Sequence, residues 1–189
     1  MLSEIKIAIL ITLVMTVITG LLYPFAITGL AQVLFPRQAN GSLLTANDQI
    51  IGSSLIGQNF AKPEYFHPRP SAAGEKGYDA ANSGGSNLAP TNPALEKRLA
   101  ESAAAFRKEN PAHIGPIPAD AITASASGLD PDISPATALA QCERIAKARN
   151  VPVARVRGLV EKQVTPRQLG LLGEARVNVL LLNLALDGK

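Results

Sequence analysis

A long uncharged segment near the N-terminus constrains this chain more than any other feature. From residue 7 to residue 36 there is no Asp, Glu, Lys or Arg. A helix needs about 20 consecutive apolar residues to cross the roughly 30 Å hydrocarbon core of a bilayer. Residues 7–28 supply 22, which predicts a transmembrane helix. We expect a short cytoplasmic tail at 1–6, a connector at 29–40 and a globular extracytoplasmic domain at 41–189.

Two other interpretations of this segment fit it less well. A cleaved signal peptide has a passable small-residue site at Gly29-Leu30-Ala31, but its apolar region runs for only about 7–15 residues. A pilin-like start would place an acid inside the apolar run, whereas Glu4 precedes it. An uncleaved anchor therefore fits best, with Pro24 expected to kink its last turns. Lys6 weakly favours a cytoplasmic N-terminus, and long domains translocate largely regardless of charge.

Composition excludes several function classes. The only cysteine is Cys142, so an intramolecular disulfide is impossible, and it is expected in the core. The two histidines, His67 and His113, lie far apart and do not provide a zinc ligand set. Net charge is only +3, with the basic residues dispersed, whereas nucleic-acid binding needs a clustered basic surface. We expect no metal, no cofactor of its own and no nucleic-acid partner.

The rest of the chain predicts an α+β domain, with a short sheet and several helices. Residues 48–57 alternate Ile and Leu with glycine, which predicts a strand or hairpin. Residues 65–66 are expected to be extended because prolines follow at 68 and 70. A short strand is predicted at 120–126. The aliphatic run at 177–186 is too short to span a bilayer; it is expected to close the core as a helix capped near Asn178, with a strand left open for its first part.

Helix starts are marked by an N-cap residue or by proline in the first turn. They occur at Asn92-Pro93, Ser134-Pro135, Pro152 and Thr165-Pro166, the last for a short helix. Helical spacing predicts which side chains the first three helices bury. These are Leu95, Leu99, Ala103 and Phe106; then Ala138, Leu139, Cys142, Ile145 and Ala146; then Val153, Val156, Leu159 and Val160. Arg144, Lys147 and Arg149 are expected outside the core or near a helix C-terminus.

Residues 69–93 form a long polar stretch rich in Gly, Ser, Asn and Pro. Such a loop in a compact domain is usually either functional or disordered. Its glycine run at 83–87 lacks the G-x-x-x-x-G-K-[ST] pattern of a phosphate cradle. Asp130 and Asp132 flank a turn, where capping of the following helix is a better interpretation than cation binding. No nucleophile–base set or acid pair emerges, so no catalytic residue is predicted.

Short motifs along nearly the whole chain resemble one family, KdpC, the C subunit of the Kdp potassium-transporting P-type ATPase. They are G-S-x-L-I-G-Q at 52–58, Y-F-H-x-R-P-S at 65–71, Y-D-A at 78–80, S-G-G-S-N-L at 83–88, N-P at 92–93, S-G-L-D-P at 127–131, I-S-P at 133–135, A-Q at 140–141, R-x-A-x-A-R at 144–149, V-N-V-L at 177–180 and the ending at 183–187. Two positions depart from the family pattern: Asp132 stands where His is frequent, and Ala175 where Pro is frequent.

The resemblance implies a non-catalytic accessory subunit of an ATP-driven, high-affinity potassium uptake pump in the bacterial plasma membrane. Its implied partners are a channel-like potassium-binding subunit, a P-type ATPase subunit and a small helical subunit. ATP and potassium would be handled by the complex, and any promotion of ATP binding would be indirect. The alternative from another class is a stand-alone, membrane-anchored binding or hydrolase domain.

The candidate residues for partner contact or for ordering of the long loop share a polar or glycine character and lie in that loop or in the later turn around Pro131. They are Arg69, Ser71, Ser83, Gly84, Gly85, Ser86, Asn87, Asp130 and Asp132.

Overall fold

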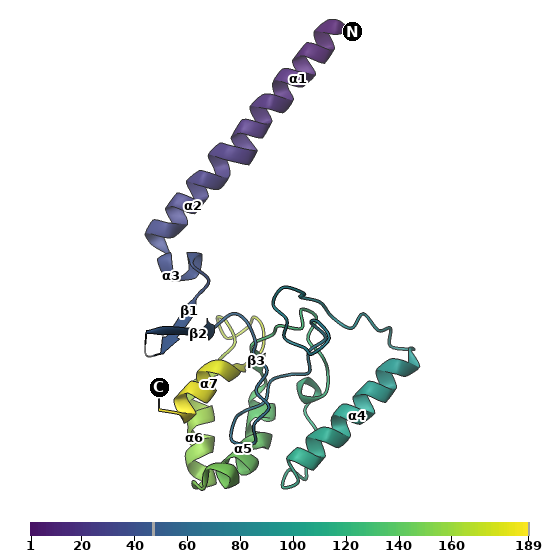
Figure 1. Ribbon diagram of the computed structural model, residues 1–189, viewed down its shortest axis with the longest axis vertical. Helices are drawn as coiled ribbons and strands as arrows, with labels where there is room; N and C mark the ends of the chain where they lie inside the picture. Colours follow the sequence, from purple (N-terminus) through teal and green to yellow (C-terminus); the bar gives the residue numbers. More distant parts are fainter. Residues whose placement is uncertain (47, 189) are drawn as a thin grey trace.

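The computed structural model describes residues 1–46 and 48–188. A long apolar helix stands apart from a domain of helices and short strands (Figure 1). The helix comprises α1 (Leu2–Val17), a π-helical turn η1 (Ile18–Leu22) and α2 (Tyr23–Leu34). It runs for 33 residues, none of them buried against the rest of the chain in its most apolar window. The helix therefore extends beyond 7–28 at both ends.

The π-turn marks the point where the helix meets Pro24. Proline has no N–H to donate to the carbonyl four residues earlier, and its ring crowds that carbonyl. The widened turn Ile18–Leu22 accommodates this mismatch, and α2 continues to Leu34. Thr12, Thr16 and Thr19 donate their hydroxyls to the carbonyls four residues before them, at 2.7–2.9 Å. These hydroxyl groups are thus satisfied within the helix.

A hairpin links the helix to the domain. After α3 (Pro36–Ala39), strand β1 (Leu43–Ala46) pairs antiparallel with β2 (Gln49–Ser53). The strand or hairpin predicted within 48–57 is confirmed as β2, and its partner β1 lies just before it. Asn178 Nδ2 donates to Ser54 O at 2.8 Å, which ties the end of the hairpin to the domain.

A second sheet assembles from three short strands that are distant in sequence. They are β3 (Asp132–Ile133), β4 (Val164–Thr165) and β5 (Arg176–Asn178), in the antiparallel order β3-β5-β4. Directly after β5 the chain turns into α7 (Val179–Leu186), and the Asn178 side chain accepts from Leu181 N at 3.1 Å. The run at 177–186 is therefore strand first and then helix, with the expected cap.

The predicted helix starts at Asn92 and Ser134 are confirmed. Asn92 caps α4 (Pro93–Glu109) by accepting from Ala94 N, and Ser134 caps α5 (Pro135–Arg149) by accepting from Thr137 N. Helix α6 (Val153–Gln163) begins one residue after Pro152. Helix α4 lies at the outer edge of the domain, and its C-terminal end comes near α5, where Arg144 donates to Asn110 (Figure 1). Of its predicted inner face only Phe106 is buried, and Leu95, Leu99 and Ala103 remain half-exposed.

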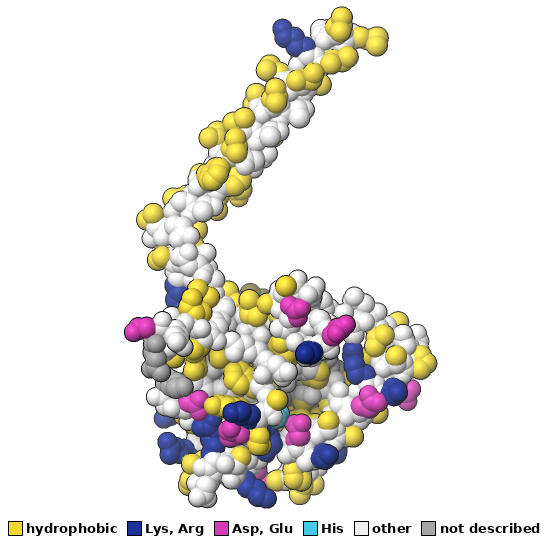
Figure 2. Space-filling view, in the orientation of Figure 1, with side chains coloured by type: hydrophobic (Ala, Val, Ile, Leu, Met, Phe, Trp, Pro, Cys, Tyr) yellow, Lys and Arg dark blue, Asp and Glu magenta, His cyan; other side chains and the backbone are white. Residues whose placement is uncertain are grey.

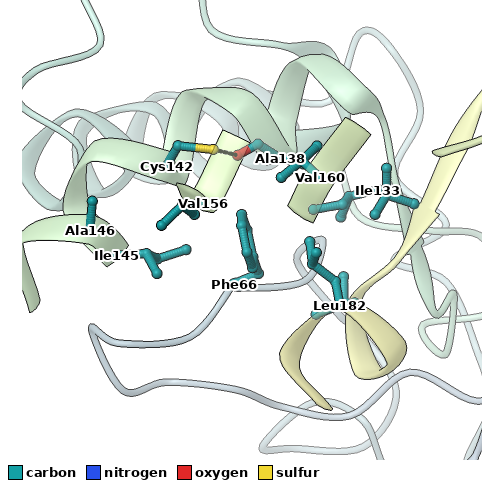
Figure 3. Packing of buried hydrophobic residues seen from close by; sticks show 11 residues of the cluster. Phe66, Ile133, Ala138, Cys142, Ile145, Ala146, Val156, Val160 and Leu182 are labelled. Carbon is teal, nitrogen blue, oxygen red and sulfur yellow. Dashed lines mark hydrogen bonds between the residues drawn. The ribbon is translucent and has the colours of Figure 1, made fainter. Parts of the chain in front are cut away.

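The core forms where α5, α6, α7 and β5 enclose one side chain from the loop region, Phe66 (Figure 3). Cys142 is in this core as expected, with no exposed surface. The core residues around Phe66 are Ile133, Ala138, Cys142, Ile145, Ala146, Val156, Val160, Val177, Val179 and Leu182. This mixed arrangement confirms the α+β prediction.

Three local predictions were wrong. Residues 119–121 form a 3₁₀ turn, η2 (Ala119–Ala121), instead of a strand, because Asp120 bends to bind the start of α5. The pair Thr165-Pro166 does not begin a helix: Thr165 belongs to β4, whose partner β5 lies eleven residues later. On α5, Leu139 is 41% exposed, and the polar Thr137 and Gln141 take the buried positions.

Candidate partner-contact site

Two buried amide side chains hold the segment that leads into the long loop. Asn183 on α7 accepts from Phe66 N at 2.8 Å and donates to Phe66 O at 3.0 Å. Gln141 on α5 accepts from His67 N at 2.8 Å and donates to His67 O at 3.1 Å. Within residues 1–46 and 48–188 no strand pairs with this backbone, and the two amides supply the hydrogen bonds that a strand would give.

Two arginines of α5 reinforce this attachment. Arg144 donates to the carbonyls of Pro63 and Tyr65 and to Asn110 Oδ1. Arg149 donates to Glu64 O at 2.7 Å, and its guanidinium lies 4.9 Å from the centre of the Tyr65 ring. Arg144 is therefore half-buried outside the apolar core, where it joins α5 to the end of α4 and to the 63–65 segment. Its pKa is lowered, chiefly by burial.

Ser71 is the centre of the next part of the loop. Its hydroxyl donates to Gly128 O at 2.6 Å and accepts from Tyr78 N at 2.8 Å and Ala73 N at 3.2 Å. Tyr78 returns the contact, since its hydroxyl donates to Arg69 O. Burial raises the pKa of Tyr78 well above its usual value, so this hydroxyl stays a donor throughout the physiological range. One serine thus joins two stretches of the loop to the 127–131 turn.

Arg69 and Asp130 form the charged part of the site. Arg69 Nη1 lies 2.7 Å from Asp130 Oδ2, and the two side chains are 24% and 29% exposed. Asp130 Oδ1 also accepts from Asp132 N at 3.0 Å. Arg69 Nε is buried without a hydrogen-bond partner in the described part of the chain. The pair is therefore shielded enough for its attraction to matter, unlike an exposed surface pair.

The glycine run lies against the same turn. Gly84 N donates to Ser127 O at 2.9 Å, and Ser83 Oγ donates to that oxygen at 3.0 Å. A Cβ on Gly85 would stand 2.8 Å from Ala126 O, so only glycine allows this approach. Ser86 and Asn87 continue the loop, and Asn87 is exposed with φ of +49°.

The structure thus separates the predicted residues into two groups. Arg69, Ser71 and the 83–85 run meet at the turn that carries Asp130. Asp132 instead pairs with Arg176 at 3.0 Å, and its pKa is raised, first by burial and then by the Asp130 charge. The prediction that these two acids cap α5 was wrong.

The capping carboxylate of α5 belongs to Asp120. Its Oδ2 accepts from Ser134 N at 2.7 Å, and its Oδ1 accepts from Ser134 Oγ and Thr137 Oγ1 at 2.8 and 2.7 Å. A carboxylate at a helix N-terminus is favoured by the helix dipole. Sequence reasoning missed this residue because it precedes the helix by fifteen positions.

A cavity of about 340 Å³ opens between α4 and the 67–78 segment, and a hollow with a histidine at its edge is visible in Figure 2. His67 Nδ1 lies 3.1 Å from Glu109 Oε2 across it. Thr137 lines this cavity and donates its hydroxyl to Asp120 Oδ1 at 2.7 Å, but both groups belong to the cap of α5. Residues 1–46 and 48–188 contain no cluster of His, Cys, Asp and Glu able to hold a metal ion. The arrangement orders a loop; it does not resemble a catalytic centre.

The hydrogen-bonding residues that sequence reasoning overlooked had a recognisable signal. Gln141 and Asn183 are polar residues inside otherwise apolar helix faces, beside Cys142 and Leu182. A buried amide needs partners for its donors and acceptors. A polar residue within such a run therefore predicts that another segment packs against it and forms hydrogen bonds with its side chain.

Comparison with known proteins agrees with this picture of a non-catalytic membrane-attached domain. A family model described as KdpC, the c chain of K+-transporting ATPase, matches residues 5–188. The Potassium-transporting ATPase KdpC subunit of Acidobacterium capsulatum is 57% identical over 187 residues, which cover 98% of each chain. The KdpC subunit of Gemmatimonas aurantiaca is 55% identical over 99% of this chain and 94% of its own length. That of Beijerinckia indica is 53% identical over 100% of this chain and 95% of its own. The chain therefore belongs to the KdpC family, the non-catalytic accessory subunit of the Kdp potassium-transporting ATPase.

Proposed function

We propose that the helix Leu2–Leu34 crosses the plasma membrane once, with the domain outside the cytoplasm, and that it lies against the channel-like subunit of the pump. The support is the helix itself, because its apolar side chains are uncovered by the rest of the chain along its most apolar window. Hydrophobic side chains lie along the visible face of this helix in Figure 2. Lipid and a partner helix are the two environments that accept such a surface.

The domain is proposed to sit over the outer mouth of the channel-like subunit, with the ATPase subunit and the small helical subunit completing the complex. The observation that carries this proposal is the ordering of the loop at 69–87. It has no helix or strand of its own, yet Arg69, Ser71 and Gly84 each bond to the 127–130 turn. A loop ordered before binding loses less conformational entropy when it meets a partner.

ATP and potassium are assigned to the partner subunits. The chain has no D-K-T-G phosphorylation motif, and an extracytoplasmic domain would meet almost no ATP. Any promotion of ATP binding by the complex is proposed to be indirect, through the contact between subunits. The chain's own contribution is then stabilisation of the assembled pump.

A mild detergent pull-down of the tagged chain from its native membrane tests the assembly. Recovery of a P-type ATPase and a channel-like protein in equal amounts is expected. A chain that purifies alone under gentle solubilisation would contradict the proposal and favour a stand-alone anchored domain.

The role of the loop is tested by Arg69→Ala, with Lys97→Ala as the matched control, because both remove one positive charge and Lys97 is 78% exposed. The first is expected to lower the yield of complex or to raise the potassium concentration that half-activates ATP hydrolysis. The second should change neither. An intact Arg69→Ala pump with unchanged potassium affinity would remove this site from the proposal.

A further inference from the structure

Three leucines project from the turn between β4 and β5. Leu169, Leu171 and Leu172 are 91%, 81% and 60% exposed. Together they form what we call the leucine tip. Scattered exposed leucines are ordinary on a protein surface, but contiguous apolar side chains on a projecting turn mark an interaction site.

The leucine tip is held outward by its backbone. Gln168 N donates to Leu172 O at 2.9 Å, and Leu172 N donates to Gln168 O at 2.9 Å, which closes the turn. Leu169 adopts a left-handed conformation with φ of +53°. This conformation is unfavourable for a residue with a branched side chain. The turn adopts this unfavourable backbone conformation and leaves its three leucine side chains exposed, not packed against the domain.

The tip lies at the end of the domain that the membrane helix enters. In the view of Figure 1 the yellow-green loop between α6 and α7 lies toward the same end of the domain as the β1–β2 hairpin. The hairpin and the turn after it add exposed apolar side chains, with Leu43, Ile50 and Leu55 at 46%, 65% and 62% exposed. Only eight residues separate Leu34 from Leu43, a chain length of at most about 30 Å. This end of the domain cannot move far from the lipid.

The charges that flank the leucine tip are compensated. Arg167 forms an ion pair with Glu174, and Arg176 pairs with Asp132 at 3.0 Å. From residue 168 to residue 173 there is no charged side chain. A free carboxylate near the apolar tip would oppose its entry into an anionic lipid surface, and here each acid already has a basic partner.

We propose that the leucine tip inserts into the outer leaflet of the bilayer, at the level of the headgroups and upper acyl chains, as a second membrane anchor for the domain. This rests on the proposed membrane crossing of α1–α2. With one anchor the domain could rotate about the connector at 35–42. A second contact fixes the face that the domain presents toward the neighbouring subunits.

The test uses the full-length chain in nanodiscs, labelled with an environment-sensitive NBD fluorophore on Leu171→Cys. The native Cys142 is buried and serves as the unlabelled background. The control is Ala154→Cys, which is exposed in the first turn of α6, at the end of the domain away from the helix (Figure 1). A third probe, Val14→Cys in the helix, reports the membrane crossing separately. Each is measured with and without phospholipids that carry a doxyl quencher.

We expect blue-shifted emission at position 171 that is quenched by shallow doxyl lipids. Emission at position 154 should be water-like and unquenched. Water-like emission at 171 while the probe at 14 is quenched by deep doxyl lipids would overturn the second anchor and leave the membrane crossing intact. A blue shift at 171 that arises only in the assembled pump, without quenching by lipid, would overturn it in favour of a subunit contact. An unquenched probe at 14 would overturn the proposed crossing, and the second anchor with it.

Discussion

The side-chain amide of Asn183 forms hydrogen bonds with both backbone groups of Phe66: its oxygen accepts from Phe66 N at 2.8 Å, and its nitrogen donates to Phe66 O at 3.0 Å. The two residues are 117 positions apart. Phe66 fills the centre of the core, and its neighbour His67 is held in the same way by Gln141. An aromatic side chain from an irregular segment thus packs in the core. Side-chain amides form the hydrogen bonds with its backbone that a neighbouring strand would otherwise form.

Replacing Asn183 with leucine should destabilise the domain strongly. The substitution keeps a similar volume but leaves Phe66 N–H and C=O buried without partners, at a cost of about 2–4 kcal/mol. Chemical denaturation of the full chain in detergent measures this. Asn59→Leu is the control, because Asn59 is exposed, and it should change the free energy of unfolding very little. Equal effects of the two substitutions would show that the amide of Asn183 is unimportant.

The ion pair of Arg69 and Asp130 should show measurable coupling. A double-mutant cycle with Arg69→Ala and Asp130→Ala is expected to give about 1 kcal/mol, since both side chains are about three-quarters shielded. The same cycle on Lys97 and Glu101, which are 78% and 66% exposed and 3.9 Å apart, should give no measurable coupling. The unfolding free energies of the four variants in each cycle decide the matter.

Two glycine substitutions should have opposite signs. Gly128 has φ of +68°, and a Cβ there would lie 2.7 Å from Ala73 Cβ and Gly84 O, so Gly128→Ala is expected to cost roughly 2 kcal/mol or more. Gly158 lies within α6, where an added Cβ meets nothing within 4 Å. Gly158→Ala should stabilise the domain by roughly 0.5–1 kcal/mol. Thermal unfolding of both variants beside the unsubstituted chain checks the two signs.

Cys142 should resist thiol reagents until the domain unfolds. Burial raises the pKa of its thiol from 9.0 to about 11, so the reactive thiolate is scarce at pH 8 as well as inaccessible. Because the folded-state pKa is raised, the associated stability is complete below pH 9 and is lost as the pH rises toward 11. Alkylation rates in native and denaturing conditions at pH 8 test the first point. A Cys142→Ala variant should show a smaller loss of stability between pH 9 and 11.

The local elements were predictable because their signals are local. The caps at Asn92 and Ser134, the apolar faces of α5 and α6, and the long apolar helix all depend on neighbours within a few residues. Side-chain spacing and capping chemistry therefore suffice to find them. The burial of Leu139 was predicted wrongly because it lies at the edge of the apolar face of α5. The elements that pack against the helix decide which residues at that edge are buried.

The strands were less predictable. Strands β3, β4 and β5 contain two or three residues each, too few for an alternating pattern to appear. Thr165 forms part of a strand because β5 lies beside it, and nothing in its own neighbourhood indicates that. The strand expected at 120–126 failed for the opposite reason, because Asp120 is recruited by a helix start that lies far along the chain.

The sequence by itself determined a membrane-length helix, a small α+β domain and the motifs of the KdpC family. Only the tertiary structure decided that Asp130 pairs with Arg69 while Asp132 pairs with Arg176, that Ser71 and Gly84 share one turn, and that Gln141 and Asn183 hold the entry to the long loop. The physical reason is that helix propensity, capping and hydrophobicity act over a few neighbouring residues. Contacts between residues more than 40 positions apart exist only once the core has brought their segments together.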